Sequence, residues 1–121
     1  MKRDVELIRK MVLAIEDCPS GWAPQQLSFD GYTPAQVGYH AYLLVNAGLV
    51  EGSIVSNNVS EGPEAFIHYL TWAGHEFAEA ARDETRWNKA MGIVKDKGGN
   101  VTLDILKQLL AGLMRSAFGL P

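Results

Sequence analysis

Three things are scarce in this sequence of 121 residues: cysteine, long apolar runs and, over most of its length, positive charge. The single cysteine, Cys18, excludes an intramolecular disulfide framework and a zinc site made of four cysteines. Since there is no apolar run of about eighteen residues and no charged-then-apolar leader, we expect a soluble, cytoplasmic protein that does not bind a membrane. The length and the 47% of apolar residues suit one domain with one core.

The positive charges are confined to the two ends of the chain. Residues 11–81, the central acidic segment, contain no Lys or Arg but eight Asp and Glu residues, while the formal charge of the whole chain is only −3. Soluble chains usually intersperse the two signs, so this segment bears on which partners its surface accepts. The eleven basic residues are Lys2, Arg3, Arg9, Lys10, Arg82, Arg86, Lys89, Lys95, Lys97, Lys107 and Arg115.

Apolar spacing and turn signals predict the elements of the first half of the chain. Apolar residues recurring every three or four positions predict a helix over 4–17. A short strand is expected at 27–29, between turn-forming residues. Thr33 and Pro34 are a favoured cap and first residue for a second helix, which continues to Asn46.

A glycine then separates this helix from a β-hairpin. Gly48 is a natural terminating residue, because glycine readily adopts the left-handed conformation that ends many helices. Two apolar arms, 49–55 and 65–70, flank a polar, turn-rich tip and predict the hairpin.

Helices are expected in the rest of the chain. Thr71 begins a third helical segment that runs to about residue 97 as one helix or as two with a bend, and Thr102 begins the last helix. Helix, short strand, helix and β-hairpin wing, followed by additional helices, is the order of an α+β, winged-helix-like domain. We therefore expect a single winged-helix-like domain over 1–121, with 72–121 as a helical C-terminal extension.

Four blocks of the sequence carry a resemblance to a known family. They are Met1-Lys2-Arg3-Asp4-Val5-Glu6-Leu7-Ile8-Arg9, the block from Tyr39-His40 to Ala47-Gly48-Leu49, Leu70-Thr71-Trp72-Ala73-Gly74-His75-Glu76-Phe77 and Ala81-Arg82-Asp83-Glu84-Thr85-Arg86-Trp87-Asn88-Lys89. Together they resemble small prophage-associated proteins catalogued as domain of unknown function 2513. The resemblance covers nearly the whole chain, and its most specific parts are the Thr-Trp-x-Gly-His and Thr-x-Trp-Asn-Lys blocks. It implies a winged-helix-like fold and a phage or prophage origin, and it implies no catalytic residues.

Residues that could carry chemistry are few. The soft metal ligands are His40, His68, His75 and Cys18, and no two of them have the spacing of a zinc finger. Cys18 follows the expected first helix, whose negative C-terminal end disfavours a thiolate nucleophile. We expect a non-enzymatic protein without a metal or cofactor.

Five residues are predicted to have structural roles: Gly48, Thr71, Trp72, His75 and Trp87. Gly48 and Thr71 end and begin helices, and His75 is expected to form a hydrogen bond across the packed start of its helix. Trp72 and Trp87 fall on the apolar face of the third helical segment, which predicts that both are core residues. A packed or half-exposed position is expected for His40.

Two functions from different classes fit this pattern. Winged-helix domains commonly place their second helix in the DNA major groove, but phosphate binding needs Lys or Arg, and the helix over 33–46 has neither. We therefore expect a protein-interaction module for a basic partner, such as a nucleic-acid-handling host protein or a defence complex; the alternative is a DNA-binding transcriptional regulator. The candidate partner-binding residues are Gln36, Tyr39, His40, Glu51, Glu61, Glu64 and Trp22.

The last helix has more apolar surface than one packing face needs. One apolar stripe is formed by Leu103, Leu106, Leu110, Leu113 and Ala117, and Leu109 and Met114 widen it. We expect the excess to be buried against a second copy, in a homodimer.

Overall fold

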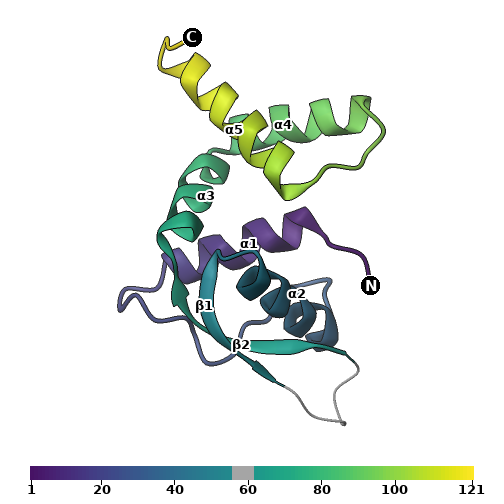
Figure 1. The fold of residues 1–121 in the computed structure, drawn as a ribbon, viewed down its shortest axis with the longest axis vertical. Helices are drawn as coiled ribbons and strands as arrows, with labels where there is room; N and C mark the ends of the chain where they lie inside the picture. Colours follow the sequence, from purple (N-terminus) through teal and green to yellow (C-terminus); the bar gives the residue numbers. More distant parts are fainter. Residues whose placement is uncertain (56–61) are drawn as a thin grey trace. The chain divides into compact units, whose positions relative to one another are not determined.

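The computed structural model describes residues 1–55 and 62–121, which form two compact units, Met1–Glu76 and Phe77–Pro121. Within these described residues there are five α-helices and one sheet of two strands (Figure 1). The α+β class predicted from the sequence is therefore confirmed. No helix among the described residues has the length and apolarity needed to span a membrane.

The first unit begins with α1, Val5–Glu16, which matches the predicted helix to within a residue at each end. Asp4 caps it, because the carboxylate accepts hydrogen bonds from the N–H groups of Glu6 and Leu7 at 3.0 and 3.2 Å. The apolar stripe of this helix is buried in the unit. Its buried apolar residues are Leu7, Ile8, Met11, Val12 and Ile15.

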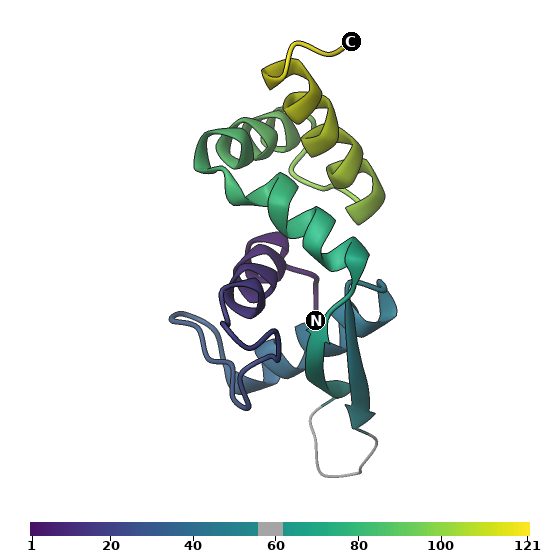
Figure 2. The same ribbon diagram turned by 90° about the vertical axis from the view of Figure 1, so that its left-hand side faces the viewer.

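The strand predicted at 27–29 does not form. Residues 17–33, which are all described, contain neither helix nor strand and are drawn as coil in Figures 1 and 2. The segment reaches the hairpin through one backbone hydrogen bond, from the N–H of Ala23 to the carbonyl of His68 at 2.8 Å. Gly21 and Gly31 both have a φ of +84°, and these turns, with Pro24 between them, stop the segment from extending along the hairpin.

The second helix, α2, is Pro34–Asn46, as predicted. Thr33 and Gln36 form a capping box, in which each side chain accepts the backbone N–H of the other residue. The helix ends at Gly48, whose φ is +74°. The N–H groups of Gly48 and Leu49 donate to the carbonyls of Val45 and Leu44 at 3.0 and 3.1 Å, which is a Schellman motif.

The hairpin follows directly and gives the first unit its sheet. Strand β1, Val50–Val55, pairs antiparallel with β2, Glu64–Leu70, and a bulge interrupts the register between Glu51 and Gly52. Helix α2 packs against both strands, and α1 packs against α2 and β2. The core of this unit therefore lies between two helices and one face of a hairpin.

The third helical segment is two helices. Helix α3, Trp72–Arg82, ends before Asp83, whose backbone is extended (φ −66°, ψ 119°). The Asp83 carboxylate accepts the N–H of Arg86 at 2.8 Å and so caps α4, Glu84–Asp96. The division between the two units falls within α3, after Glu76.

The second unit is helical. Gly98 and Gly99, both with positive φ, follow α4, and Thr102 caps α5, Leu103–Ala117, as predicted. Helices α4 and α5 pack against each other. The unit buries Trp87, Ala90 and Val94 of α4 together with Leu106 and Leu110 of α5.

Candidate functional site

A groove of about 920 Å³ opens on the first unit. Its lining comes from three segments: the coil 22–28, one face of α2 and five consecutive residues of β2. Among the described residues the lining is mostly apolar and contains no Lys or Arg. A concave apolar surface with a few polar groups is the usual form of a binding site. The lining residues are Trp22, Ala23, Pro24, Gln25, Gln26, Leu27, Ser28, Pro34, Val37, Gly38, Ala41, Glu64, Ala65, Phe66, Ile67 and His68.

Helix α2 gives the groove its floor because small residues recur along one of its faces. Pro34, Val37, Gly38 and Ala41 are three, four and seven positions apart, which places them together on a helix. A Cβ at Gly38 would lie 3.1 Å from the side-chain carbons of Glu64. The Glu64 side chain therefore lies directly over the glycine and covers part of the floor.

Two aromatic residues in the lining are largely exposed. Trp22 is 62% exposed and Phe66 is 64% exposed. Trp22 packs edge-on against Tyr69, with 5.7 Å between ring centroids, which holds the indole without covering it. Large exposed aromatic side chains beside an apolar groove are typical of residues that anchor a partner.

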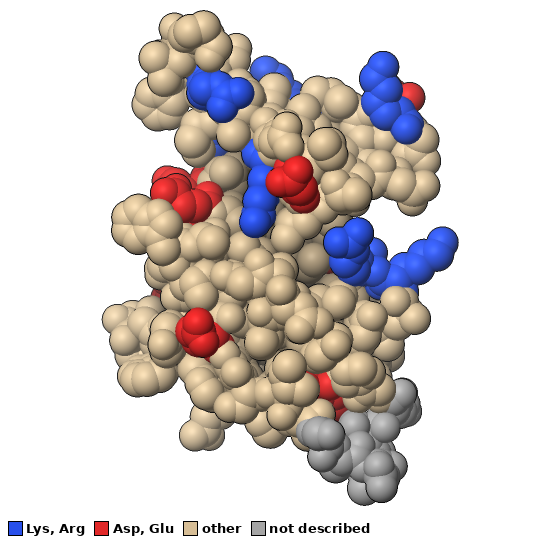
Figure 3. Space-filling model, in the orientation of Figure 1, with Lys and Arg blue, Asp and Glu red and all other residues tan. Residues whose placement is uncertain are grey.

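The electrostatic character of this region is set by the absence of cations from residues 11–76, the greater part of the first unit. On the face drawn in Figure 3, red and tan atoms lie over α2 and the hairpin, without blue atoms among them. Glu51 is exposed on β1, and the half-buried Glu64 lines the groove. Within residues 11–76 an incoming cation therefore meets no Lys or Arg, although the ammonium of Lys10 lies near the Tyr32 ring.

Among the predicted partner-binding residues, three belong to this region and one cannot be placed. Trp22 and Glu64 line the groove, and Glu51 lies exposed on the neighbouring strand. Glu61 lies outside the described residues.

The three residues predicted on α2 do not line this groove. His40 is wrongly predicted as a binding residue, because it is only 1% exposed. Gln36 uses its side-chain oxygen to accept the N–H of Thr33 at 2.8 Å. Tyr39 is half-buried and stacks on Tyr42, with 6.0 Å between ring centroids.

His40 instead belongs to a polar cluster at the start of α1. Its Nε2 accepts the backbone N–H of Asp4 at 2.8 Å. The Tyr32 hydroxyl donates to the Asp4 carboxylate at 3.1 Å, and the ammonium of Lys10 lies 5.8 Å from the centroid of the Tyr32 ring. Burial first, then the hydrogen bond to Asp4 and the negative charges of Asp4 and Glu6, raise the pKa of the Tyr32 phenol. This cluster fixes α1 to the neighbouring segments.

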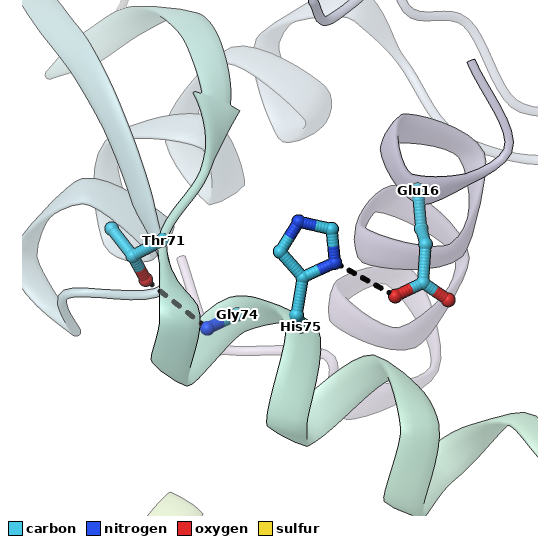
Figure 4. Close-up of polar contacts among 4 residues, drawn as sticks. All are labelled: Glu16, Thr71, Gly74 and His75. Atoms are coloured by element: carbon cyan, nitrogen blue, oxygen red, sulfur yellow. Dashed lines mark hydrogen bonds and ion pairs between the residues drawn. The ribbon is translucent and has the colours of Figure 1, made fainter. Parts of the chain in front are cut away.

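Thr71 and Gly74 explain part of the Thr-Trp-x-Gly-His block (Figure 4). The Thr71 hydroxyl donates to the carbonyl of Gly48 at 2.6 Å. It also accepts the N–H of Gly74 at 3.1 Å, the contact drawn in Figure 4. A Cβ at Gly74 would overlap the carbonyl oxygen of Leu49. The structural roles predicted for Thr71 and Gly48 are present in this junction, and α3 approaches the end of α2 as closely as a glycine allows.

His75, the last residue of the block, is oriented differently from the prediction. Its Nδ1 lies 3.0 Å from a carboxylate oxygen of Glu16 at the end of α1, and 56% of its side chain is exposed (Figure 4). The hydrogen bond therefore joins two helices and does not cross a packed helix start.

Trp72 corrects the prediction of two core tryptophans. It is 81% exposed, whereas Trp87 is 1% exposed and is a core residue, as predicted. Residues two positions apart on a helix point in nearly opposite directions. Because Gly74 faces Leu49, the side chain of Trp72 faces away from the packed junction.

Sequence reasoning missed Gly38, Phe66 and Ala23 as parts of the site. Gly38 carried a usable signal, because a glycine inside a helical pattern often marks a close approach. Phe66 alternates with the buried positions of its strand, which indicates an exposed face. Nothing local marks Ala23, since its role depends on a hydrogen bond to a residue 45 positions away.

Metal-ligating side chains are spread out. No three His, Cys, Asp or Glu side chains come together in a way that would hold a metal ion within residues 1–55 and 62–121.

Comparison with known proteins identifies relatives. Residues 2–100 match the model of a family described as "Hypothetical protein (DUF2513)". A protein of Haemophilus influenzae (strain ATCC 51907 / DSM 11121 / KW20 / Rd), described as "Uncharacterized protein", is 34% identical over 112 residues, which cover 90% of this chain and 92% of that protein. No solved structure matches the chain.

Proposed function

The chain belongs to the DUF2513 family, and we propose that its first unit is a winged-helix-like module that binds a basic protein partner without catalysing a reaction. The groove beside β2 carries this function. It combines two exposed aromatic side chains, Trp22 and Phe66, with an apolar floor and an acidic residue, Glu64. Such a surface suits a partner segment that has both apolar and basic side chains.

The winged-helix-like description rests on element order and packing. A helix, a connecting segment, a second helix and a hairpin follow one another, and the second helix packs against both strands. The hairpin takes the place of the wing. Two features depart from the usual plan: the first strand is replaced by coil, and α1 and α2 are joined by the seventeen residues 17–33 instead of a three- to four-residue turn.

These departures and the charge pattern favour a protein partner over DNA. In a helix-turn-helix domain the second helix reads the major groove while the first crosses the backbone, and Lys and Arg neutralise the phosphates. Here α2 carries no Lys or Arg, and the described part of the hairpin carries Glu51 and Glu64. Docked in that way, the unit would present carboxylates to phosphates.

The chemistry of the partner follows from the same features. Proteins that handle nucleic acids present basic surfaces, and complementary potentials accelerate their encounter with an acidic one. We propose such a protein, belonging to a phage or to its bacterial host, as the natural partner.

A pair of tryptophans allows a controlled test. The full chain is used to select binders from a display library of short random peptides, and the affinity of a selected peptide is measured by fluorescence titration. We expect selected peptides to be rich in Lys, Arg and apolar residues. Trp22→Ser should weaken binding by about tenfold or more, since buried anchors dominate such interfaces.

Trp72→Ser is the matched control, because Trp72 is exposed but does not line the groove. It should leave the affinity unchanged. If the library yields no binder, or if Trp72→Ser weakens binding as much as Trp22→Ser, the groove is not the site. A short random-sequence DNA duplex is titrated in parallel. Tight binding of the duplex at physiological salt would favour the alternative function, a DNA-binding transcriptional regulator.

A further inference from the structure

We infer that the groove accepts its partner as an added β-strand, which pairs with the edge of β2 that faces away from β1. This inference rests on the proposed function and specifies how the partner binds. Strand addition to an exposed sheet edge is a general mode of peptide recognition, in which main-chain hydrogen bonds give affinity and pockets for alternate side chains give specificity.

The first support is that one wall of the groove is a strand edge. Residues 64–68 of β2 all line the groove, one after the other. Successive side chains of a strand point to opposite faces, so a lining that includes every residue in turn follows the edge of the strand rather than one of its faces. Among the described residues the sheet has two strands, and β2 pairs with β1 alone.

The second support is that the neighbouring position along this edge lacks a strand. The segment 27–29, which was predicted to be a strand and lies next to or in the groove lining, is coil. Across the described residues 22–28, the one backbone hydrogen bond to β2 is from Ala23 to the carbonyl of His68. Residues 64–67 receive no backbone hydrogen bond from this coil, so main-chain groups on the outer edge of β2 remain available for an incoming strand.

The third support is the shape and charge of the floor. Ala41 leaves room for side chains that an added strand would direct toward α2, while its other side chains would meet Phe66 and Trp22 at the opening. Glu64 lies over Gly38 and offers a carboxylate at this point of the groove. The added segment should therefore alternate small apolar residues with larger ones and carry a Lys or Arg near Glu64.

Backbone methylation of a ligand tests this mode directly. A peptide selected on the full chain is synthesised with single N-methyl groups, one position at a time. Methylation removes one N–H and leaves every side chain in place, so alternate positions should each weaken binding by about tenfold or more while the positions between them have little effect.

Filling the floor gives a second, independent readout. Gly38→Leu should weaken binding of the same peptide, because the new side chain and the displaced Glu64 occupy the groove. Gly92→Leu is the matched control, since Gly92 lies in α4 and a Cβ there would meet no atom within 4 Å. Thermal melting verifies that both variants fold. Hydrogen exchange of the wild-type chain should show slower exchange at alternate amides of 64–68 when the peptide is bound.

The outcomes separate the two proposals. If no peptide binds, the protein-binding function itself fails. If peptides bind but tolerate methylation at every position and bind Gly38→Leu as well as the wild type, the function stands and strand addition is wrong. In the free protein, slow exchange at the amides of 27–29 and at those amides of 64–67 that do not pair with β1 would show that the chain's own segment fills the edge, and that result would also overturn the inference.

Discussion

The buried ring of His40 accepts the backbone N–H of Asp4 at 2.8 Å, and its other nitrogen lies 2.8 Å from the carbonyl oxygen of Gln36. Since the carbonyl can only accept, Nδ1 carries the proton and donates, and Nε2 carries the lone pair. The two hydrogen bonds fix a neutral tautomer and join the cap of α1 to the first turns of α2. One side chain thus connects two helices that are separated by a long coil.

Removing this ring should destabilise the fold. His40→Ala leaves the N–H of Asp4 without its partner in a partly buried place and opens a cavity, so we expect a loss of about 2 kcal/mol or more in the free energy of unfolding. Urea denaturation measures it. His75→Ala is the control, since His75 is largely exposed and should cost less than about 1 kcal/mol. Equal, small losses for both variants would contradict the connecting role of His40.

The close approach of Gly74 to Leu49, at the junction between α2 and α3, leads to a second prediction. Gly74→Ala places a Cβ against the carbonyl oxygen of Leu49, which is backbone and cannot move aside, so we expect a loss of about 2 kcal/mol or more. Gly92→Ala should instead stabilise the chain by about 0.5–1 kcal/mol, because its helical position is open and alanine favours a helix. Melting temperatures that shift in the same direction would show that the close approach is wrong.

The raised pKa of Tyr32 predicts that the folded state loses stability at alkaline pH. The pKa of its phenol is raised above the ordinary value of about 10, so the folded chain holds this proton more tightly than the unfolded chain does. The stabilising contribution is complete below pH 10 and is lost as the pH rises through the raised pKa. Urea denaturation of wild type and Tyr32→Phe from about pH 8 to 11 should show the stability difference between them shrinking at alkaline pH. A difference that stays constant would contradict the contribution of the Tyr32 hydroxyl.

The apolar surface that α5 leaves uncovered remains consistent with the predicted homodimer. Leu106 and Leu110 of α5 are buried, but Leu109 and Leu113 are half-buried and Ile105 is 52% exposed. We expect this remaining apolar surface to pair with a second copy about a two-fold axis. Light scattering of the full chain at micromolar concentration measures the mass, and Ile105→Asp should reduce it to that of a monomer. A monomer mass for the wild type would remove the dimer.

Local signals in the sequence were enough for most of the elements. Thr33, Thr71 and Thr102 were predicted to begin helices, and Gly48 to end one, because capping depends on residues within one helical turn. The prediction of a strand at 27–29 was wrong, because a strand forms only by pairing with a segment that is distant in the sequence, and local signals do not specify that pairing. The prediction that Trp72 is a core residue was wrong, because the direction of its side chain is set by the contact of Gly74 with Leu49.

The site was predictable only in part. Trp22, in a glycine- and proline-containing segment, was predicted to be exposed, and it is; Glu64, chosen as an exposed residue beside the hairpin tip, is half-buried and lines the same groove. The choice of His40 as a partner-binding residue was wrong. Its hydrogen-bond partner, Asp4, is 36 residues away, so local patterns do not reveal the buried position of the ring. The groove itself is assembled from three segments that local patterns cannot bring together.

The choice between a protein partner and DNA is tested most directly by reversing the charge beside the groove. The full chain and its Glu51→Lys/Glu64→Lys variant are titrated with a selected basic peptide and with a random-sequence duplex at physiological salt. We predict that the wild type binds the peptide and not the duplex, and that the variant loses peptide affinity, mainly through a slower association rate, while gaining duplex affinity. If the wild type already binds the duplex, and the two substitutions leave that affinity unchanged, DNA binds through another face and the account of an acidic protein-binding module is wrong.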